Sequence, residues 1–278
     1  MKRISRLAVD VLLYGFLIAI SFYMILPFVW MLSSSLKPES EIFSIPPILF
    51  SKNMTLGAYI TVIVDGNILR VLLNTFIIAA GATAARLFFC SLGGFGFAKY
   101  KFIGKGLLFG ILVATLVVPF SVTLIPLFII MSRIHWTNTF LPLIIPGAAS
   151  AFGIFFMRQY ISTINNELLD SARIDGASEF RIFLSIIVPI VAPGMTSLGL
   201  IFFMGAWNDF LWPLVILKKP ELFTLPIAIN QMIQSMIGRP VYSQQMAAAV
   251  LSIIPLLIIF LVFQRRFVEG ITAGAIKG

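Results

Sequence analysis

Residues 167–189 read ELLDSARIDGASEFRIFLSIIVP, and they form a charged island in an otherwise apolar chain. Hydrophobic residues make up 59% of the sequence and charged residues only 11%. Seven of the charged residues nevertheless lie between positions 158 and 181: Arg158, Glu167, Asp170, Arg173, Asp175, Glu179 and Arg181. At roughly 2.5–3.5 kcal/mol per charged side chain at mid-bilayer, placing all of them in hydrocarbon costs at least about 17 kcal/mol. This stretch therefore lies in water, between two membrane spans.

The first part of the stretch has the chemistry of a short helix. Asn165 or Asn166 can cap it, and Glu167 and Asp170 lie in its first turn, where the positive end of the helix dipole favours acidic side chains. One narrow apolar face is predicted, formed by Leu168, Leu169, Ala172, Ile174 and Ala177. A short, partly apolar helix outside the membrane suits docking into a partner's groove. An ordinary solvated linker has the same composition, so both interpretations stand on this chemistry.

A turn and a second helix are predicted to follow. Gly176 has the backbone freedom needed to end the first helix and reverse the chain. Ser178 or Asp175 can then cap a second helix that runs toward Pro189. Because proline lacks an amide donor and clashes with the preceding turn, Pro189 is expected to bend or end this helix.

The composition identifies a polytopic membrane protein. The 278-residue chain has a mean hydropathy of +1.03, and several apolar segments reach the roughly 20 residues needed to cross a bilayer. The net charge of +9 does not indicate nucleic-acid binding, because Lys and Arg lie in short loops beside the predicted spans. We expect one all-α domain over residues 1–278, with a cytoplasmic loop at 158–189 and six spans at about 8–32, 70–97, 107–131, 140–157, 190–210 and 246–263.

Basic residues set the expected orientation of these spans. Lys2, Arg3 and Arg6 precede the first span, and Arg265 and Arg266 follow the sixth. Twelve Lys and Arg residues are counted on the predicted inner side and seven on the outer side, with Arg70 at the start of the second span included among the seven. The excess on one side predicts that both termini and the charged loop are cytoplasmic.

Two spans carry unusual residues. The second is rich in Gly and Ala, which allow helix backbones to approach closely in lipid, so it is predicted to pack on other helices. It also contains Arg86, which is interpreted as a snorkelling or helix-paired side chain, with a role in a polar path as the alternative. The third span contains Pro119 and Pro126, so its helix is predicted to be kinked or broken.

The chain lacks the residue patterns of an enzyme. There is no G-x-x-x-x-G-K-[ST] phosphate-binding loop, and the single cysteine (Cys90) and single histidine (His135) support no metal site or catalytic triad. The eleven acidic residues lie in loops or near predicted span ends, whereas ion-driven transporters usually place an ionisable group near the midplane. We therefore expect no catalytic residue, cofactor or metal, and an energy source in another subunit. A secondary transporter or channel driven by an ion gradient is the alternative, and a membrane-embedded enzyme is a third, weaker one.

The charged stretch resembles the EAA loop of ABC-importer permeases. Asp170, Ser171 and Ala172 occupy the E-A-A positions, Gly176 the glycine, and Val188 with Pro189 the final hydrophobic-proline pair. Asp replaces Glu and Ser replaces Ala in the first two of these positions. The segments FFMRQY (155–160), AWNDFLWPL (206–214) and RFVEGITAGAIKG (266–278) are similar to those of the carbohydrate-uptake branch, the maltose and glycerol-3-phosphate type.

This resemblance implies a fold, a set of partners and roles for particular residues. It implies a MetI-like permease bundle in a prokaryotic plasma membrane that forms half of a path for a sugar or related solute. The implied partners are a second permease in a heterodimer, an ATPase dimer that binds the ATP, and an external solute-binding protein. The implied ATPase-coupling residues are Glu167, Asp170, Ser171, Ala172, Asp175, Gly176 and Pro189, with a secondary contact at Gly270, Thr272, Gly274 and Lys277. Asn208 and Asp209 are interpreted as helix-capping residues or as part of the mouth of the pathway.

Overall fold

A computed structural model describes residues 2–234 and 241–275, and this part of the chain contains helices and no strand. The predicted all-α class is confirmed. One 3₁₀ turn, Thr115–Val117, follows α5, and another, Pro220–Leu222, precedes α13. A π-helical turn, Phe183–Ile187, separates α10 from α11. The α-helices are α1 (Lys2–Ser35), α2 (Glu39–Ile42), α3 (Gly57–Val64), α4 (Ile68–Lys99), α5 (Lys105–Ala114), α6 (Phe120–Arg133), α7 (Leu141–Ile144), α8 (Ala151–Ser162), α9 (Asn166–Ile174), α10 (Glu179–Ile182), α11 (Val188–Trp207), α12 (Leu211–Ile216), α13 (Leu225–Gln234) and α14 (Tyr242–Ala275).

Four segments are long and apolar enough to cross a membrane: Val9–Ser35, Ile68–Lys99, Glu179–Trp207 and Tyr242–Arg265. A fifth span is possible if Lys105–Val117 and Phe120–Arg133 count as one, and these two segments meet at an angle of 101°. The break lies at Pro119, so the predicted break in the third span is confirmed. The predicted fourth span, 140–157, is not one helix, because α7 ends before Pro146 and Gly147 and α8 begins after them. The count of six spans stays a prediction.

The contacts of the chain divide it into two compact units, which are described separately. The first unit contains the residues up to Ile68 and Ile229–Ile254. In it, the ammonium group of the buried Lys37 donates to the carbonyl of Ile48 and lies 4.4 Å from the centroid of the Trp30 ring. The Glu39 carboxylate accepts hydrogen bonds of 2.8 and 3.0 Å from the first amides of α14. An acidic side chain at this helix N-terminus satisfies amides that have no partner within the helix.

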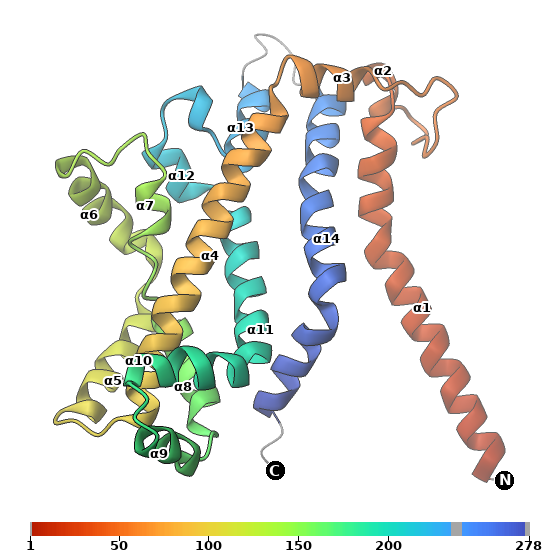
Figure 1. Cartoon of the computed structure of the whole chain (residues 1–278). Helices are drawn as coiled ribbons and strands as arrows, with labels where there is room; N and C mark the ends of the chain where they lie inside the picture. Colours follow the sequence, from red (N-terminus) through yellow and green to blue (C-terminus); the bar gives the residue numbers. More distant parts are fainter. Residues whose placement is uncertain (1, 235–240, 276–278) are drawn as a thin grey trace. The chain divides into compact units, whose positions relative to one another are not determined.

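The second unit contains Leu69–Ala228 and the chain from Pro255 onward, and it carries the charged loop. Within it, α4 and α8 approach closely: a Cβ placed on Gly94 would lie only 2.7 Å from the Met157 Cβ and 2.8 Å from the Arg158 amide nitrogen. This confirms that small residues of the second span pack against another helix. In Figure 1, α5, α9 and α10 gather at the end of the unit where α4 ends, whereas α6, α7 and α12 lie toward its other end.

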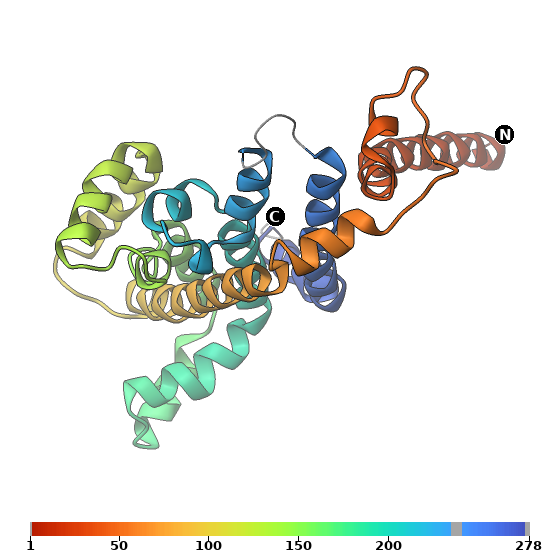
Figure 2. The ribbon, with the colours of Figure 1, turned by 90° about the horizontal axis from the view of Figure 1, so that it is seen from above.

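Pro189 lies where the chain changes direction between α10 and α11. The helix does not end there, because α11 begins at Val188 and continues to Trp207. Figure 2, seen from above, shows the segment formed by α10 and the π-helical turn running sideways from α11. The wider π-helical turn immediately before Pro189 accommodates a residue that has no amide donor. The predicted bend is therefore present, and the helical segment begins earlier than the predicted fifth span.

Candidate functional site

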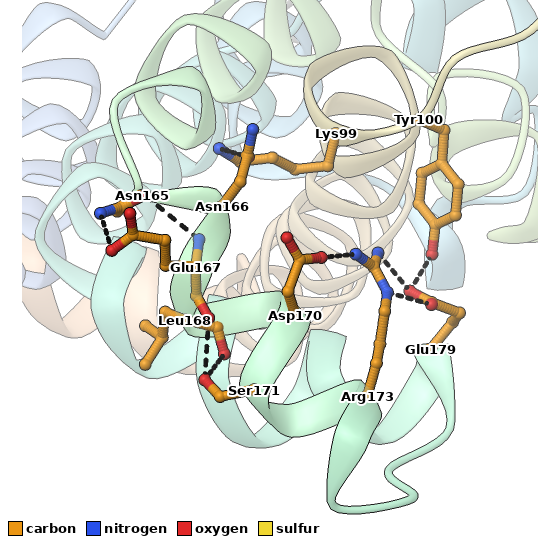
Figure 3. Close-up of polar contacts among 10 residues, drawn as sticks. All are labelled: Lys99, Tyr100, Asn165, Asn166, Glu167, Leu168, Asp170, Ser171, Arg173 and Glu179. Atoms are coloured by element: carbon orange, nitrogen blue, oxygen red, sulfur yellow. Dashed lines mark hydrogen bonds and ion pairs between the residues drawn. The ribbon is translucent and has the colours of Figure 1, made fainter.

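The candidate site is the helix–turn–helix made by α9 and α10, and Asn165 begins it. The Asn165 side-chain oxygen accepts a hydrogen bond of 3.1 Å from the Glu167 amide, so Asn165 is the N-cap of α9. Its side-chain nitrogen donates to the Glu167 carboxylate at 3.1 Å. The Lys99 ammonium group, at the end of α4, donates to the Ile164 carbonyl and to the Asn166 side chain. The start of α9 is thus fixed to α4 as well as to its own cap (Figure 3).

Leu169 anchors α9 to the core. Its side chain is 1% exposed and packs with buried residues of α8, α10 and α11 and of the π-helical turn, among them Met157, Ile161, Ile182, Phe183, Ile187 and Val191. Ala172 lies against the same cluster. Leu168 and Ile174 instead remain 43% and 86% exposed. This differs from the single apolar face predicted, because consecutive residues on a helix point about 100° apart and Leu168 cannot follow Leu169 inward.

Gly176 makes the turn between the two helices. Its φ is +81°, a left-handed conformation that glycine adopts readily and other residues adopt at a cost. The Gly176 and Ala177 amides donate to the carbonyls of Arg173 and Ala172, both at 3.0 Å, which closes the end of α9. The Ser178 hydroxyl then accepts from the Arg181 amide at 3.3 Å and caps α10. The predicted glycine turn and the Ser178 cap are both confirmed.

A network of charged side chains joins α9, α10 and the end of α4 (Figure 3). Arg173 lies between two carboxylates: its Nη1 is 2.7 Å from Asp170 Oδ1, and its Nε is 2.7 Å from Glu179 Oε1. A second bond of 3.2 Å, from Nη2 to Glu179 Oε2, makes the contact with Glu179 bidentate. The Tyr100 hydroxyl also donates to Glu179. We call these four residues, Tyr100, Asp170, Arg173 and Glu179, the Arg173 network.

The Arg173 network raises the pKa values of Arg173 and Tyr100. The pKa of Arg173 lies above its ordinary value, chiefly because Glu179 accepts its hydrogen bonds, with Asp170 adding to the effect. Burial, together with the hydrogen bond and negative charge of Glu179, raises the pKa of Tyr100 to about 12. Both shifts favour the form that donates to Glu179, the charged guanidinium of Arg173 and the neutral hydroxyl of Tyr100.

The other predicted coupling residues have local roles in the same helix. The Ser171 hydroxyl donates to the Glu167 carbonyl at 2.8 Å, one turn earlier. Asp175 is the residue at the C-terminal end of α9, and its amide donates to the Ser171 carbonyl at 3.0 Å. The structure thus brings Glu167, Asp170, Ser171, Ala172, Asp175 and Gly176 together on one short element, with Pro189 farther along, after the π-helical turn.

Asn208 and Asp209 both make side-chain hydrogen bonds at helix ends, and Asp209 comes just before Phe210, the N-cap residue of α12. The Asn208 side chain donates to the Met204 carbonyl at 2.9 Å, at the end of α11. Asp209 Oδ1 accepts from the Trp212 amide at 3.4 Å, at the start of α12. Of the predicted tail contacts, Gly270, Thr272 and Gly274 lie in the last part of α14, and Lys277 lies outside the described residues.

Sequence reasoning missed three members of the Arg173 network as site residues. Arg173 and Glu179 were visible only as part of a charged run, although an acid and a base three residues apart, as in Asp170 and Arg173, indicate a helical ion pair. Tyr100 lies 79 residues from Glu179, and no sequence signal indicates that they meet.

Residues 90–273 match a family described as the inner membrane component of binding-protein-dependent transport systems. The chain belongs to this family. The match includes α9, α10 and the turn between them, and the family's description is that of a transport component.

Individual relatives agree with this membership. The chain is 34% identical to the arabinooligosaccharides transport system permease protein AraQ of Bacillus subtilis, over 95% of this chain and 94% of that protein. It is 31% identical to the lactose transport system permease protein LacG of Rhizobium radiobacter, over the full length of both. It is 34% identical to the sn-glycerol-3-phosphate transport system permease protein UgpE of Shigella flexneri, over 73% of this chain and 72% of that protein.

Solved structures have the same fold. A chain of a bacterial ABC transporter involved in the import of the acidic polysaccharide alginate superposes with a TM-score of 0.79 at 21% identity, covering 92% of this chain and 96% of that one. The predicted ABC-importer permease fold is therefore confirmed.

Proposed function

We propose that this chain is the permease subunit of an ATP-driven importer, forming half of the translocation path for a carbohydrate. Membership of the binding-protein-dependent transport family supports the importer role. The names of the relatives AraQ and LacG, which refer to arabinooligosaccharides and lactose, support a sugar as the solute. The chain itself binds no ATP in this proposal, so ATP hydrolysis belongs to a partner subunit.

The coupling proposal rests chiefly on one observation: α9 is attached to the helix bundle by buried, ionic and hydrogen-bonded contacts, yet it leaves apolar side chains in solvent. Leu169 and the Arg173 network hold the helix against α4, α10 and α11. Ile174 is 86% exposed and Leu168 is 43% exposed. Exposed apolar side chains on a fixed helix suit insertion into a groove of another protein. A rigid-body movement of that protein would then be passed directly to the spans.

The remaining partners follow from the same family assignment. A second permease, as a different chain, completes the path, and an external solute-binding protein delivers the sugar. One similar structure is that of an alginate ABC transporter in complex with a periplasmic protein carrying an alginate pentasaccharide, at a TM-score of 0.65. The chain lies in a prokaryotic plasma membrane with both termini and α9 in the cytoplasm. In this proposal the C-terminal end of α14, with Gly270 and Thr272, makes a second contact with the ATPase.

Cross-linking from α9 tests the coupling proposal. A photoreactive amino acid is introduced at Ile174, which is exposed, and separately at Leu169, which is buried and serves as the control. We expect irradiation of membranes to join the Ile174 variant, and not the Leu169 variant, to an ATPase subunit. Capture of no ATPase at Ile174, together with uptake that follows an ion gradient, would contradict the proposal and favour a secondary transporter.

A further inference from the structure

A cavity of about 530 Å³ lies within the second unit, away from α9. Its lining comes from α4, α6, α7 with the turn that follows it, and the start of α12, and it includes Arg86, Thr123, Asp209 and Trp212. Figures 1 and 2 both show α6, α7 and α12 close together beside α4. The volume is within the range of small-molecule sites, about 300–1,000 Å³.

Arg86 presents hydrogen-bond donors to this cavity. Its Nε donates to the Gly147 carbonyl at 3.3 Å, and its guanidinium carbon lies 5.5 Å from the centroid of the Phe202 ring. A guanidinium group has five N–H donors. Within the part of the chain that the structure describes, the bond to Gly147 is the one hydrogen bond of this side chain, so most of its donors can bind a ligand.

Asp209 presents an acceptor to the same cavity. Its Oδ1 accepts from the Trp212 amide at 3.4 Å, and among the described residues its Oδ2 has no hydrogen-bonding partner. Among those residues Arg86 and Asp209 also form no ion pair of 4.0 Å or less, although both line the cavity. Two opposite charges that line one cavity without an ion pair between them can both bond to a molecule that enters it.

Aromatic and hydroxyl groups complete the lining. The indole nitrogen of Trp212 donates to the Pro142 carbonyl at 2.9 Å, and the Phe120 ring meets the indole edge to face at 6.0 Å. The indole is therefore fixed in place. The Thr123 hydroxyl donates to the Phe120 carbonyl at 2.9 Å, so its oxygen can still accept a hydrogen bond.

We propose that this cavity binds an uncharged carbohydrate during transport, with Arg86 donating to its hydroxyl groups and Asp209 accepting from them. A sugar hydroxyl is both donor and acceptor, so it satisfies a group that only donates and a group that only accepts. A phosphate or carboxylate would bond to Arg86 but would be repelled by Asp209. The pairing therefore favours neutral sugars over anionic solutes. This inference rests on the proposed importer function and deepens it.

Uptake by cells tests the inference. Cells express the importer with either the wild-type chain or a variant as the only copy of this subunit. The cells are given radiolabelled lactose, arabinotriose or sn-glycerol 3-phosphate at concentrations below half-saturation. We expect uptake of at least one neutral probe, and a decrease of about tenfold or more in Arg86→Gln and Asp209→Asn, because each removes a charged hydrogen-bonding group. Arg133→Gln and Glu221→Gln are matched controls at exposed positions outside the cavity, and they should transport like wild type.

Two further readouts keep the outcomes separate. Uptake is divided by the amount of chain in the membrane, and Asp209→Asn, which keeps the shape of the side chain, gives the decisive comparison if Arg86→Gln accumulates poorly. ATPase co-purification is measured in parallel. Wild-type chain that holds no ATPase would overturn the proposed function itself. Three results would overturn only the carbohydrate site if the ATPase is retained. They are wild-type uptake in both Arg86→Gln and Asp209→Asn, no uptake of either neutral probe by the wild-type chain, and uptake of glycerol 3-phosphate alone.

Discussion

Substitution of Gly176 tests the turn that ends α9 with few complications. Its φ is +81°, and a Cβ built on it would have no atom within 4 Å. Any cost of a side chain at this position therefore comes from the backbone conformation and not from a clash. A non-glycine residue in this left-handed region costs roughly 1–2 kcal/mol, less for Asn and more for a β-branched residue. The expected conformational cost at position 176 rises in the order Gly, Asn, Ala, Val.

The consequence for ATPase binding follows from this cost. If α9 must keep its observed end to dock, a strain of about 1.4 kcal/mol lowers the population of the competent turn about tenfold. The apparent Kd for the ATPase should then rise up to about tenfold in Gly176→Ala and further in Gly176→Val, with Gly176→Asn between wild type and Ala. Binding of purified ATPase to the chain in lipid nanodiscs measures these constants.

Gly104 provides the matched control. It lies just before α5 with a φ of +80°, and a Cβ there would also meet nothing within 4 Å. Gly104→Val should therefore impose similar strain without changing the ATPase affinity. Wild-type affinity in Gly176→Val, or an equal loss in Gly104→Val, would refute the assignment of the 176 turn to docking.

Three further predictions concern the same site. The bidentate contact between Arg173 and Glu179 has side chains 36% and 45% exposed, so a double-mutant cycle with Arg173→Gln and Glu179→Gln should give a coupling of about 0.2–1 kcal/mol in ATPase affinity; strictly additive effects would show that the ion pair does not act in docking. Leu169→Ala should lower the free energy of unfolding of the purified protein by about 2–5 kcal/mol and lower its Tm, whereas Leu168→Ala should leave both unchanged and weaken ATPase binding. Equal Tm shifts in the two variants would contradict the burial of Leu169. The raised pKa of Tyr100 favours its neutral form in the folded protein, so the stability that this group contributes is complete below pH 10 and is lost as the pH rises through about 12; tyrosinate absorbance of wild type minus Tyr100→Phe should titrate near 12, and titration near 10 would contradict the contact with Glu179.

Local chemistry accounts for the features that could be predicted from the sequence. The Asn165 and Ser178 caps, the Gly176 turn and the break at Pro119 each depend on the conformational preference of one residue and its immediate neighbours. The position of α9 outside the bilayer was predicted from the cost of burying seven charges, and this position remains a prediction.

The features that could not be predicted depend on contacts between distant segments. Glu179 meets Tyr100 across 79 residues, and Arg86 meets Gly147 across 61. The cavity between Arg86 and Asp209 arises only when α4, α6, α7 and α12 pack together. The single apolar face predicted for α9 was wrong, because a nine-residue helix with leucines at 168 and 169 does not show from its sequence which leucine points inward.

The π-helical turn at Phe183–Ile187 has a consequence for how this segment tolerates changes in length. A π turn holds one more residue per hydrogen-bonded loop than an α turn, so residues on its two sides are out of step with an uninterrupted α-helix. Ile182 before it, Phe183 and Ile187 within it, and Val191 and Leu198 after it nevertheless all belong to one buried core. Deleting a single residue here would make the helix more regular and at the same time rotate α11 away from the partners that α9 and α10 keep. The segment can thus accept substitutions far more easily than it can lose a residue.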